Sequence, residues 1–218
     1  MSSKTLDQRL NESFIELEIS KEQQDSILLY LNLIKNRSTQ TWEHSVRVGL
    51  TGKSIAEYTH IVEPKALYYP GLLHDVGKSL IHPLSLDKKQ GFNDNDRKEL
   101  SKHPIDGYRI LKGIHDFSAR VALTHHEFQG ERSYPRKVPR LELNLLNQTQ
   151  AMISYCARLI SLIDFYDAAT FRENDRYSPG KPRLLTNEEV KSDLIKHNPD
   201  QKYLIENLYN VKIFGRED

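Results

Sequence analysis

The sequence is short of cysteine, of long apolar runs and of net charge, and each shortage excludes a class of protein. Cys156 is the only cysteine among 218 residues, so the chain can form no internal disulfide and no cluster of thiolate ligands. No stretch has the length and hydropathy of a membrane span, and the N-terminus MSSKTLDQRL lacks the apolar region of a secretory signal. We therefore expect a cytoplasmic protein whose metal ions, where it binds them, are held by histidine and carboxylate.

The formal net charge is +1, which predicts neither a long nucleic acid nor an anionic membrane surface as a partner. Local charge is more informative. Two segments are net positive: one carries Arg132, Arg136, Lys137 and Arg140 against Glu131 and Glu142, and the other carries Arg172, Arg176, Lys181 and Arg183 against Glu173 and Asp175. A charged loop is usually only solvated, but two basic loops beside candidate ligands suggest an anionic substrate such as a phosphodiester.

A chain of this length fits one domain with a small addition, and we divide it into an N-terminal arm and helix (1–36) and a main domain (37–218). The alternating segment Ile15–Ile19 is compatible with a short strand or with an ordered arm that packs on the body. Strand signals are otherwise almost absent. The sequence predicts an all-α fold.

Helical periodicity and capping residues predict the positions of the helices. We expect helices over Ser20–Lys35, from near Trp42, from Pro64 to His74, from Asn93 to His103, after Ser118, over Asn144–Thr170, over Thr186–His197 and from Asn198, with a loop over Ile81–Phe92. His103-Pro104 is expected to end its helix, because the residue before a proline is biased away from the α region.

The stretch Leu72-Leu73-His74-Asp75-Val76-Gly77-Lys78 places an imidazole beside a carboxylate after an apolar run. Successive side chains on a helix point about 100° apart, so both groups face one cavity only where the helix ends. Gly77 suits such an end, since glycine tolerates positive φ. The pair can hold one divalent cation or bridge two, and Lys78 can meet a phosphate. Taken alone, the pair could equally be a helix cap.

Other candidate ligands stand at comparable places along the chain. His103 precedes a proline, His125 and His126 are adjacent and so indicate another helix end, and Asp164 lies on the apolar stripe of the longest helix. A carboxylate buried there needs a basic partner or a cation. His44 faces a packed helix bundle, where a single histidine could also be a core residue satisfied by a hydrogen bond.

The order His44, His74-Asp75, Asp164 resembles the H…HD…D signature of the HD superfamily of metal-dependent phosphohydrolases. LLHDVGK, His103-Pro104, the run His125-His126-Glu127 and Tyr134-Pro135 look like the HD-GYP subgroup, whose members are bacterial cyclic di-GMP phosphodiesterases. The likeness covers roughly residues 42 to 177, and is more specific than any single motif.

The resemblance implies an HD-domain helical bundle with a binuclear iron, manganese or related centre that hydrolyses a phosphodiester by a metal-bound hydroxide. It implies that Asp75 bridges two metal ions, one held by His44, His74 and Asp164 and the other by His103, His125 and His126. Asp75 and Lys78 would be catalytic, and Lys78 would contact the phosphate.

Departures from the family pattern cluster in one loop. The GYP motif is Ser133-Tyr134-Pro135 here. The acidic residue that usually precedes the first glycine of the family motif is also replaced, and the nearest local sequence is Gln129-Gly130-Glu131. These changes affect the expected recognition of the base and of a partner, and we expect Arg132, Tyr134 and Arg136 to meet substrate. Gln40 stands where some relatives with three metals have glutamate, which favours two. The family has an arginine at a fixed spacing after Asp164, and no arginine of this sequence stands at that spacing. Either Arg172 or Arg176 could take its role of binding phosphate.

Three functions remain open at this point. The first is a phosphodiesterase that acts on cyclic di-GMP or a related cyclic dinucleotide and that a signalling protein could regulate. The second is a general HD phosphohydrolase acting on nucleotides or alarmones. The third is a non-catalytic HD module that binds a ligand or partner, which is disfavoured because every metal position is filled.

Overall fold

The computed structural model describes residues 4–129, 133–136, 146–173 and 183–215. The described chain is helical and contains no β-strand, as the fold class predicted. Its elements are α1 (Leu6–Glu16), α2 (Lys21–Lys35), α3 (Thr39–Thr59), α4 (Pro64–Leu73), η1 (Val76–Leu80), α5 (Pro83–Leu86), α6 (Asp94–Leu100), α7 (His103–Leu111), α8 (Asp116–Thr124), α9 (Asn147–Phe171), α10 (Asn187–His197), η3 (Pro199–Gln201) and α11 (Lys202–Asn210). None of these helices is long and apolar enough to cross a membrane.

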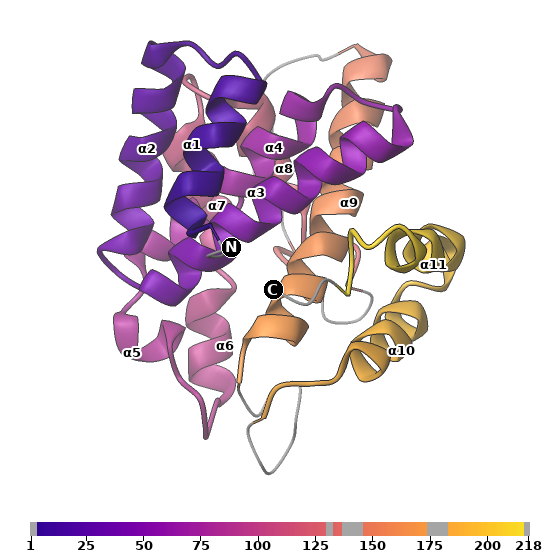
Figure 1. The fold of residues 1–218 in the computed structure, drawn as a ribbon. Helices are drawn as coiled ribbons and strands as arrows, with labels where there is room; N and C mark the ends of the chain where they lie inside the picture. Colours follow the sequence, from indigo (N-terminus) through magenta and orange to yellow (C-terminus); the bar gives the residue numbers. More distant parts are fainter. Residues whose placement is uncertain (1–3, 130–132, 137–145, 174–182, 216–218) are drawn as a thin grey trace.

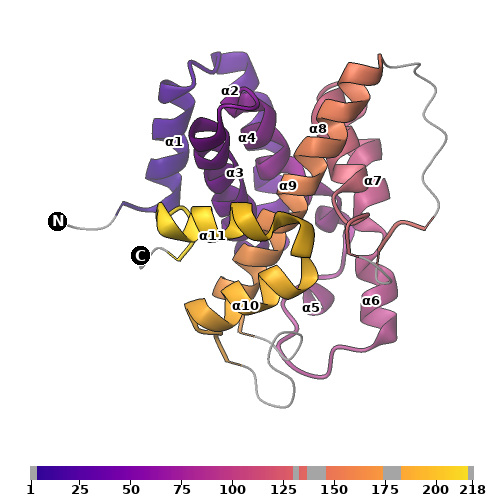
Figure 2. The same ribbon diagram turned by 90° about the vertical axis from the view of Figure 1, so that its right-hand side faces the viewer.

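The long helix α9 runs through the middle of the fold (Figures 1 and 2). It packs against α3, α4, α8 and α10, and its apolar face shares one hydrophobic cluster with residues of α3, α10 and α11. A second cluster joins α1 and α2 to α3, α4, α7 and α8. The described residues before position 37 thus share their core with the rest of the chain, and the division at residue 36 stays a prediction about organisation.

Glycine residues bring α3 and α4 close together. A Cβ atom on Gly49 would lie 2.6 Å from Leu72 Cδ2, and one on Gly71 would lie 2.7 Å from the Cα of Gly49. Only glycine lets the two backbones approach this closely. Because α3 carries His44 and α4 ends at His74, this contact sets two candidate ligands side by side.

The N-terminal segment contains a helix and no strand. Thr5 and Gln8 form a reciprocal capping box at the start of α1, and Leu10 and Phe14, one turn apart, are buried. Residues 15–19 cover the end of that helix and the turn after it. The strand alternative was wrong, because alternation over five residues is too short to outweigh the helical spacing before it.

Two further boundaries differ from the expectations. His103 begins α7 rather than ending the preceding helix, since Pro104 occupies the first turn, where its missing N–H costs no helical hydrogen bond. Ser118 lies inside α8, which starts at Asp116. The segment expected to be a loop holds the short helix α5.

Gly77 is required for a different reason from the one the sequence suggested. It lies in η1 and has no positive φ, but a Cβ atom there would lie only 2.0 Å from the carbonyl oxygen of His103 and 2.6 Å from the amide nitrogen of Gly107. Both neighbours are backbone atoms, which cannot rotate away. Gly77 thus lets the His-Asp turn press directly on the helix that carries His103.

We expect Gly77→Ala to lower the free energy of unfolding by at least ~2 kcal/mol, because the added methyl group overpacks a backbone contact. Urea unfolding followed by circular dichroism measures this. Gly107→Ala is the matched control: its Cβ would meet no atom closer than 3.5 Å, and alanine is the better helix former. Equal destabilisation by both substitutions would contradict the close-packing explanation.

Candidate metal centre

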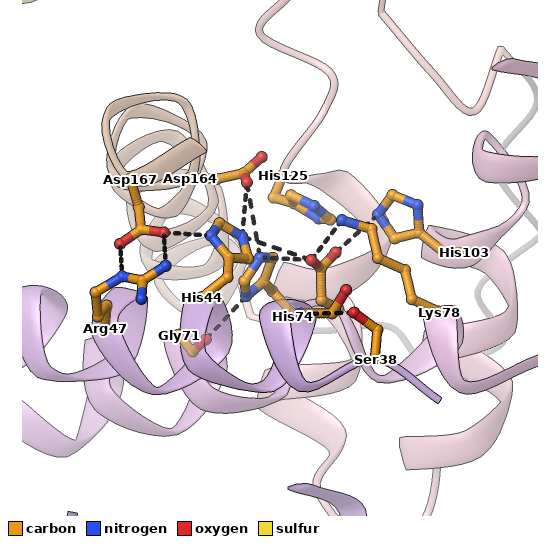
Figure 3. A network of polar contacts seen from close by, with 12 residues as sticks. Ser38, His44, Arg47, Gly71, His74, Lys78, His103, His125, Asp164 and Asp167 are labelled. Atoms are coloured by element: carbon orange, nitrogen blue, oxygen red, sulfur yellow. Dashed lines mark hydrogen bonds and ion pairs between the residues drawn. The ribbon is translucent and has the colours of Figure 1, made fainter. Parts of the chain in front are cut away.

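The seven side chains predicted as ligands come together in one buried cluster at the centre of the fold. His44 comes from the second turn of α3, His74 and Asp75 from the end of α4, His103 from the start of α7, His125 and His126 from the end of α8, and Asp164 from α9. All seven are buried, with at most 8 % of their surface exposed. Figure 3 shows His44, His74, His103, His125 and Asp164 around a common centre.

Three of the five imidazoles are oriented by main-chain carbonyls at the ends of helices. The Nδ1 atom lies 2.8 Å from the Gly71 carbonyl oxygen in His74, 2.6 Å from that of Leu100 in His103, and 2.7 Å from that of Ala122 in His125. Each partner is the carbonyl three residues back, which lies near a helix end. A carbonyl only accepts hydrogen bonds, so Nδ1 carries the proton and Nε2 keeps a free lone pair.

The other two imidazoles are oriented by side chains. His44 Nδ1 lies 2.6 Å from Asp167 Oδ2, and Arg47 donates to both oxygens of that carboxylate at 2.6 and 3.0 Å (Figure 3). His126 Nδ1 lies 2.6 Å from the side-chain amide of Gln129. The sequence analysis missed Asp167, Arg47 and Gln129. Spacing could have found the first two, since each follows a predicted ligand by three residues and so lies on the same helix face.

The ligand atoms converge without satisfying one another. His44 Nε2, His74 Nε2 and His125 Nε2 are buried and form no hydrogen bond, and the same holds for Asp75 Oδ1. His44 Nε2 lies 3.0 Å from Asp164 Oδ1, the nearest carboxylate oxygen on this side of the ring. Leaving buried polar atoms unpaired is costly. A cation placed among these lone pairs would satisfy them, so the residues fit a metal site.

Asp75 lies between two groups of imidazoles and turns one oxygen to each. Its Oδ2 lies 3.5 Å from Nε2 of both His44 and His74, and its Oδ1 lies 3.2 Å from Nε2 of His103. The potential ligand atoms of His44, His74 and Asp75 all lie within 4.8 Å of one another, as do those of His103, His125 and His126. The same holds for His74, His125 and Asp164, so His125 lies near both groups. This arrangement suits a carboxylate that bridges two ions.

The protonation states also suit metal binding. Burial lowers the pKa of His74 to about 4, and burial likewise holds the pKa values of His103 and His126 well below the usual one. Burial alone would raise the pKa of the Asp75 carboxyl, but the neighbouring Lys78 ammonium helps to hold it well below its ordinary value. Neutral imidazole and ionised carboxylate are the forms that bind cations.

Lys78 donates to Asp75 Oδ2 at 2.5 Å, so in the structure its partner is the proposed bridging carboxylate. Burial lowers the pKa of Lys78, Asp75 opposes this, and the charge of Arg172 lowers the pKa further. Arg172 follows α9, and its Nε and Nη2 atoms are buried without a hydrogen-bond partner. Lys78 and Arg172 thus lie close enough at the edge of the cluster for the charge of Arg172 to lower the pKa of Lys78.

The residues predicted to meet substrate have different outcomes. The Tyr134 ring stacks on His126 with centroids 4.2 Å apart and meets His103 edge-on at 6.0 Å. Arg136 is exposed. Arg132 and Arg176 lie outside the described residues. Through Tyr134 and Gln129 the divergent loop contacts a candidate ligand, a link that the sequence analysis did not anticipate.

Comparison with known families identifies the fold. A family model described as "HD domain" matches residues 41–169, more than half of the chain. The chain belongs to the HD domain family. The match begins at the first turn of α3 and ends near the end of α9, so it contains all seven clustered residues.

Several curated relatives of this HD domain chain are phosphodiesterases by name. It is 29% identical over 160 residues to a cyclic di-GMP phosphodiesterase of Pseudomonas aeruginosa, covering 71% of this chain and 36% of the relative. It is 27% identical over 162 residues to a 3'3'-cGAMP-specific phosphodiesterase of Vibrio cholerae, covering 72% and 35%. A cyclic di-GMP phosphodiesterase of Thermotoga maritima is 27% identical over 173 residues, covering 76% and 44%. The matched region is therefore less than half the length of each of these proteins.

Among solved structures, the HD domain of the L. monocytogenes phosphodiesterase PgpH superposes with a TM-score of 0.54 at 21% identity. The superposition covers 83% of this chain and 86% of that one. At this identity the likeness supports the helical HD fold and nothing finer.

The buried imidazoles make the metal-free chain sensitive to acid. Between pH 6.5 and about 4 the unfolded chain binds a proton at His74 that the folded chain does not, so stability is full above this window and falls as the pH drops through it. His103, His125 and His126, whose pKa values burial also lowers, act in the same direction. Urea unfolding of chelator-treated protein at about pH 7.5 and about pH 5 should show a loss of several kcal/mol. Equal stability at the two values would contradict neutral, buried imidazoles.

Proposed function

We propose that this chain is a metal-dependent phosphodiesterase that hydrolyses cyclic di-GMP or a related cyclic dinucleotide. The observation that carries the proposal is the buried cluster of five imidazoles and two carboxylates, in which His44 Nε2, His74 Nε2, His125 Nε2 and Asp75 Oδ1 have no hydrogen-bond partner. The names of the curated relatives supply the substrate class. Because those relatives extend well beyond the matched region, the substrate of the whole protein and its regulatory partner belong to this proposal.

We assign His44, His74 and Asp164 to one divalent ion, His103, His125 and His126 to the other, and Asp75 to both. Iron or manganese suits this donor set of imidazole and carboxylate. When bound, two such ions supply an activated water and stabilise the attacking and leaving oxygens of an in-line displacement. The chain's own part is to hold the ligands deprotonated and directed inward before any ion arrives.

Basic side chains at the edge of the cluster would bind the phosphodiester. Lys78, which donates to Asp75 here, would donate to a phosphate oxygen if Asp75 served as a metal ligand. The buried Nε and Nη2 atoms of Arg172 have no hydrogen-bond partner, and a phosphate oxygen would supply one. Arg172 is thus favoured over Arg176 for this role. Tyr134, on the ring of His126, would wall the site beside the substrate, with Arg132 and Arg136 in the same loop. A cytoplasmic location, where a cyclic dinucleotide would be met, stays a prediction.

The decisive assay reconstitutes the purified chain anaerobically with Fe²⁺ or Mn²⁺ and measures turnover of cyclic di-GMP, 3'3'-cGAMP, nucleoside phosphates and an alarmone. Cleavage of a cyclic dinucleotide in preference to the others supports the proposal. Preference for nucleotides or the alarmone would make the chain a general HD phosphohydrolase. Metal binding without turnover of any of them would favour a non-catalytic module.

Asp75→Ala should abolish turnover and remove most of the bound metal, because Asp75 turns one carboxylate oxygen toward His44 and His74 and the other toward His103. We expect kcat/KM to fall by more than about 100-fold, beyond the effect typical of residues that only support a ligand. Asp200→Ala is the control, since this exposed carboxylate pairs with Arg158 away from the cluster. Near-normal metal content in Asp75→Ala would refute the bridging role.

Lys78→Ala should have the opposite effect on metal. Removing the ammonium frees Asp75, so metal affinity should stay equal or rise, while kcat/KM should fall by about 100-fold or more through lost stabilisation of the transition-state phosphate. Metal analysis and kinetics on the same samples separate the two effects. Loss of metal, or wild-type kinetics, would show that Lys78 only supports the structure.

A further inference from the structure

We infer that Asp167 and Gln129 are positioning residues for the metal centre, and that each serves a different half of it. The inference rests on the metal centre of the proposed function. Asp167 fixes His44, in the half that contains His74 and Asp164, and Gln129 fixes His126, in the half that contains His103 and His125. The two halves can therefore be weakened one at a time without changing a ligand.

His44 needs an outside partner because of its place in the chain. It lies in the second turn of α3, inside the helix, where the main-chain carbonyls already accept helical hydrogen bonds, unlike the helix-end carbonyls that orient His74, His103 and His125. Asp167 supplies the acceptor from α9, one turn after Asp164. One stretch of α9 thus provides both the candidate ligand Asp164 and the carboxylate of Asp167 that orients His44.

Asp167 is buried, with 3 % of its surface exposed, so its charge needs compensation. Arg47 supplies it with two hydrogen bonds and packs over the Phe171 ring, its guanidinium carbon 4.4 Å from the ring centroid. The carboxylate is therefore held rigidly, and it can only accept from Nδ1 of His44. This fixes the proton on Nδ1 and leaves Nε2 free to bind a cation.

Gln129 works differently, because its amide is neutral and can present either an oxygen or an NH₂ group. His126 Nε2 lies 3.2 Å from His103 Nε2, whose ring already donates from Nδ1 to a carbonyl. Without a cation, His126 can donate from Nε2 to His103 and accept at Nδ1 from the amide NH₂ of Gln129. With a cation on Nε2 the proton must be on Nδ1, and the amide oxygen then accepts it after a half turn.

The contacts of Asp167 and Gln129 predict different effects of substitution at the two positions. Leucine at either position removes the acceptor. Asp167→Asn keeps the shape but weakens the hold on His44 and on Arg47, whereas Gln129→Glu keeps an acceptor for the metal-binding form of His126. Asp200→Asn and Gln24→Leu are matched controls, since each removes the same kind of group from a contact outside the cluster.

The experiment titrates the metal-free full chain with Mn²⁺ in a calorimeter and follows Co²⁺ binding by its visible absorption, with no cyclic dinucleotide present. Asp167→Leu and Gln129→Leu should each weaken one equivalent of metal by about 10- to 100-fold and leave the other within about twofold. Asp167→Asn should lower the affinity for that equivalent of metal by about 10-fold, and Gln129→Glu should bind both equivalents as tightly as the unchanged chain. The controls should match the unchanged chain throughout.

Assignment to the halves comes from adding His103→Ala, which removes a candidate ligand that is grouped with the second half alone. In that background Gln129→Leu should change the remaining equivalent by less than about twofold, while Asp167→Leu should still weaken it by about 10-fold or more. Loss of the same equivalent in both variants, or no loss in folded Asp167→Asn and Gln129→Leu, would overturn the inference. Circular dichroism establishes that each variant is folded, and Asp167→Asn decides the first half where Asp167→Leu does not fold.

The outcome is separable from that of the proposed function. Separate losses of metal in a chain that cleaves no cyclic dinucleotide would uphold the positioning roles and refute the substrate. Cleavage of cyclic di-GMP by the unchanged chain, together with unaltered metal binding in the variants, would refute the positioning roles alone.

Discussion

The burial of one carboxylate, Asp75, is the constraint on which the rest of the site depends. A carboxylate with 0 % exposure is stable only with nearby positive charge, and the structure surrounds it with Lys78 and the lone pairs of imidazoles that attract a cation. Three features serve this burial: the end of α4, the close approach at Gly77 and the packing of α3 on α4. The fold around the site thus brings the Asp75 carboxylate and the Lys78 ammonium together in the buried interior of the protein.

Sequence reasoning found the seven candidate ligands that the structure gathers in one cluster, because their chemistry is local. Adjacent ligands such as His74-Asp75 and His125-His126 can face one cavity only at a helix end, and both pairs lie at helix ends. The same reasoning could not decide whether His103 ended one helix or began the next, since a proline is compatible with both. Nor could it foresee that Gly77 is needed for the approach of α7, because that contact joins segments about 26 residues apart and leaves no local pattern.

The groups that orient the ligands were harder to predict than the ligands. Asp167 and Arg47 lie at helical spacing from Asp164 and His44, but their contact depends on how α3 and α9 are aligned, which periodicity does not give. Gln129 belongs to the stretch that departs from the family pattern, so the resemblance gave no role for it. The resemblance did predict the all-helical fold and the family, both of which the structure and the family match confirm.

The contacts of His74, His103 and His125 with carbonyls three residues back have a consequence for how this protein can vary. The direction of each ring is tied to the register of a helix end, and one inserted residue in the preceding turn would rotate that end by about 100°. Insertions and deletions in α4, α6 and α8 are therefore excluded even at exposed positions. Variation in length among related chains should gather instead in the connections between these helices, where it leaves the rings in place.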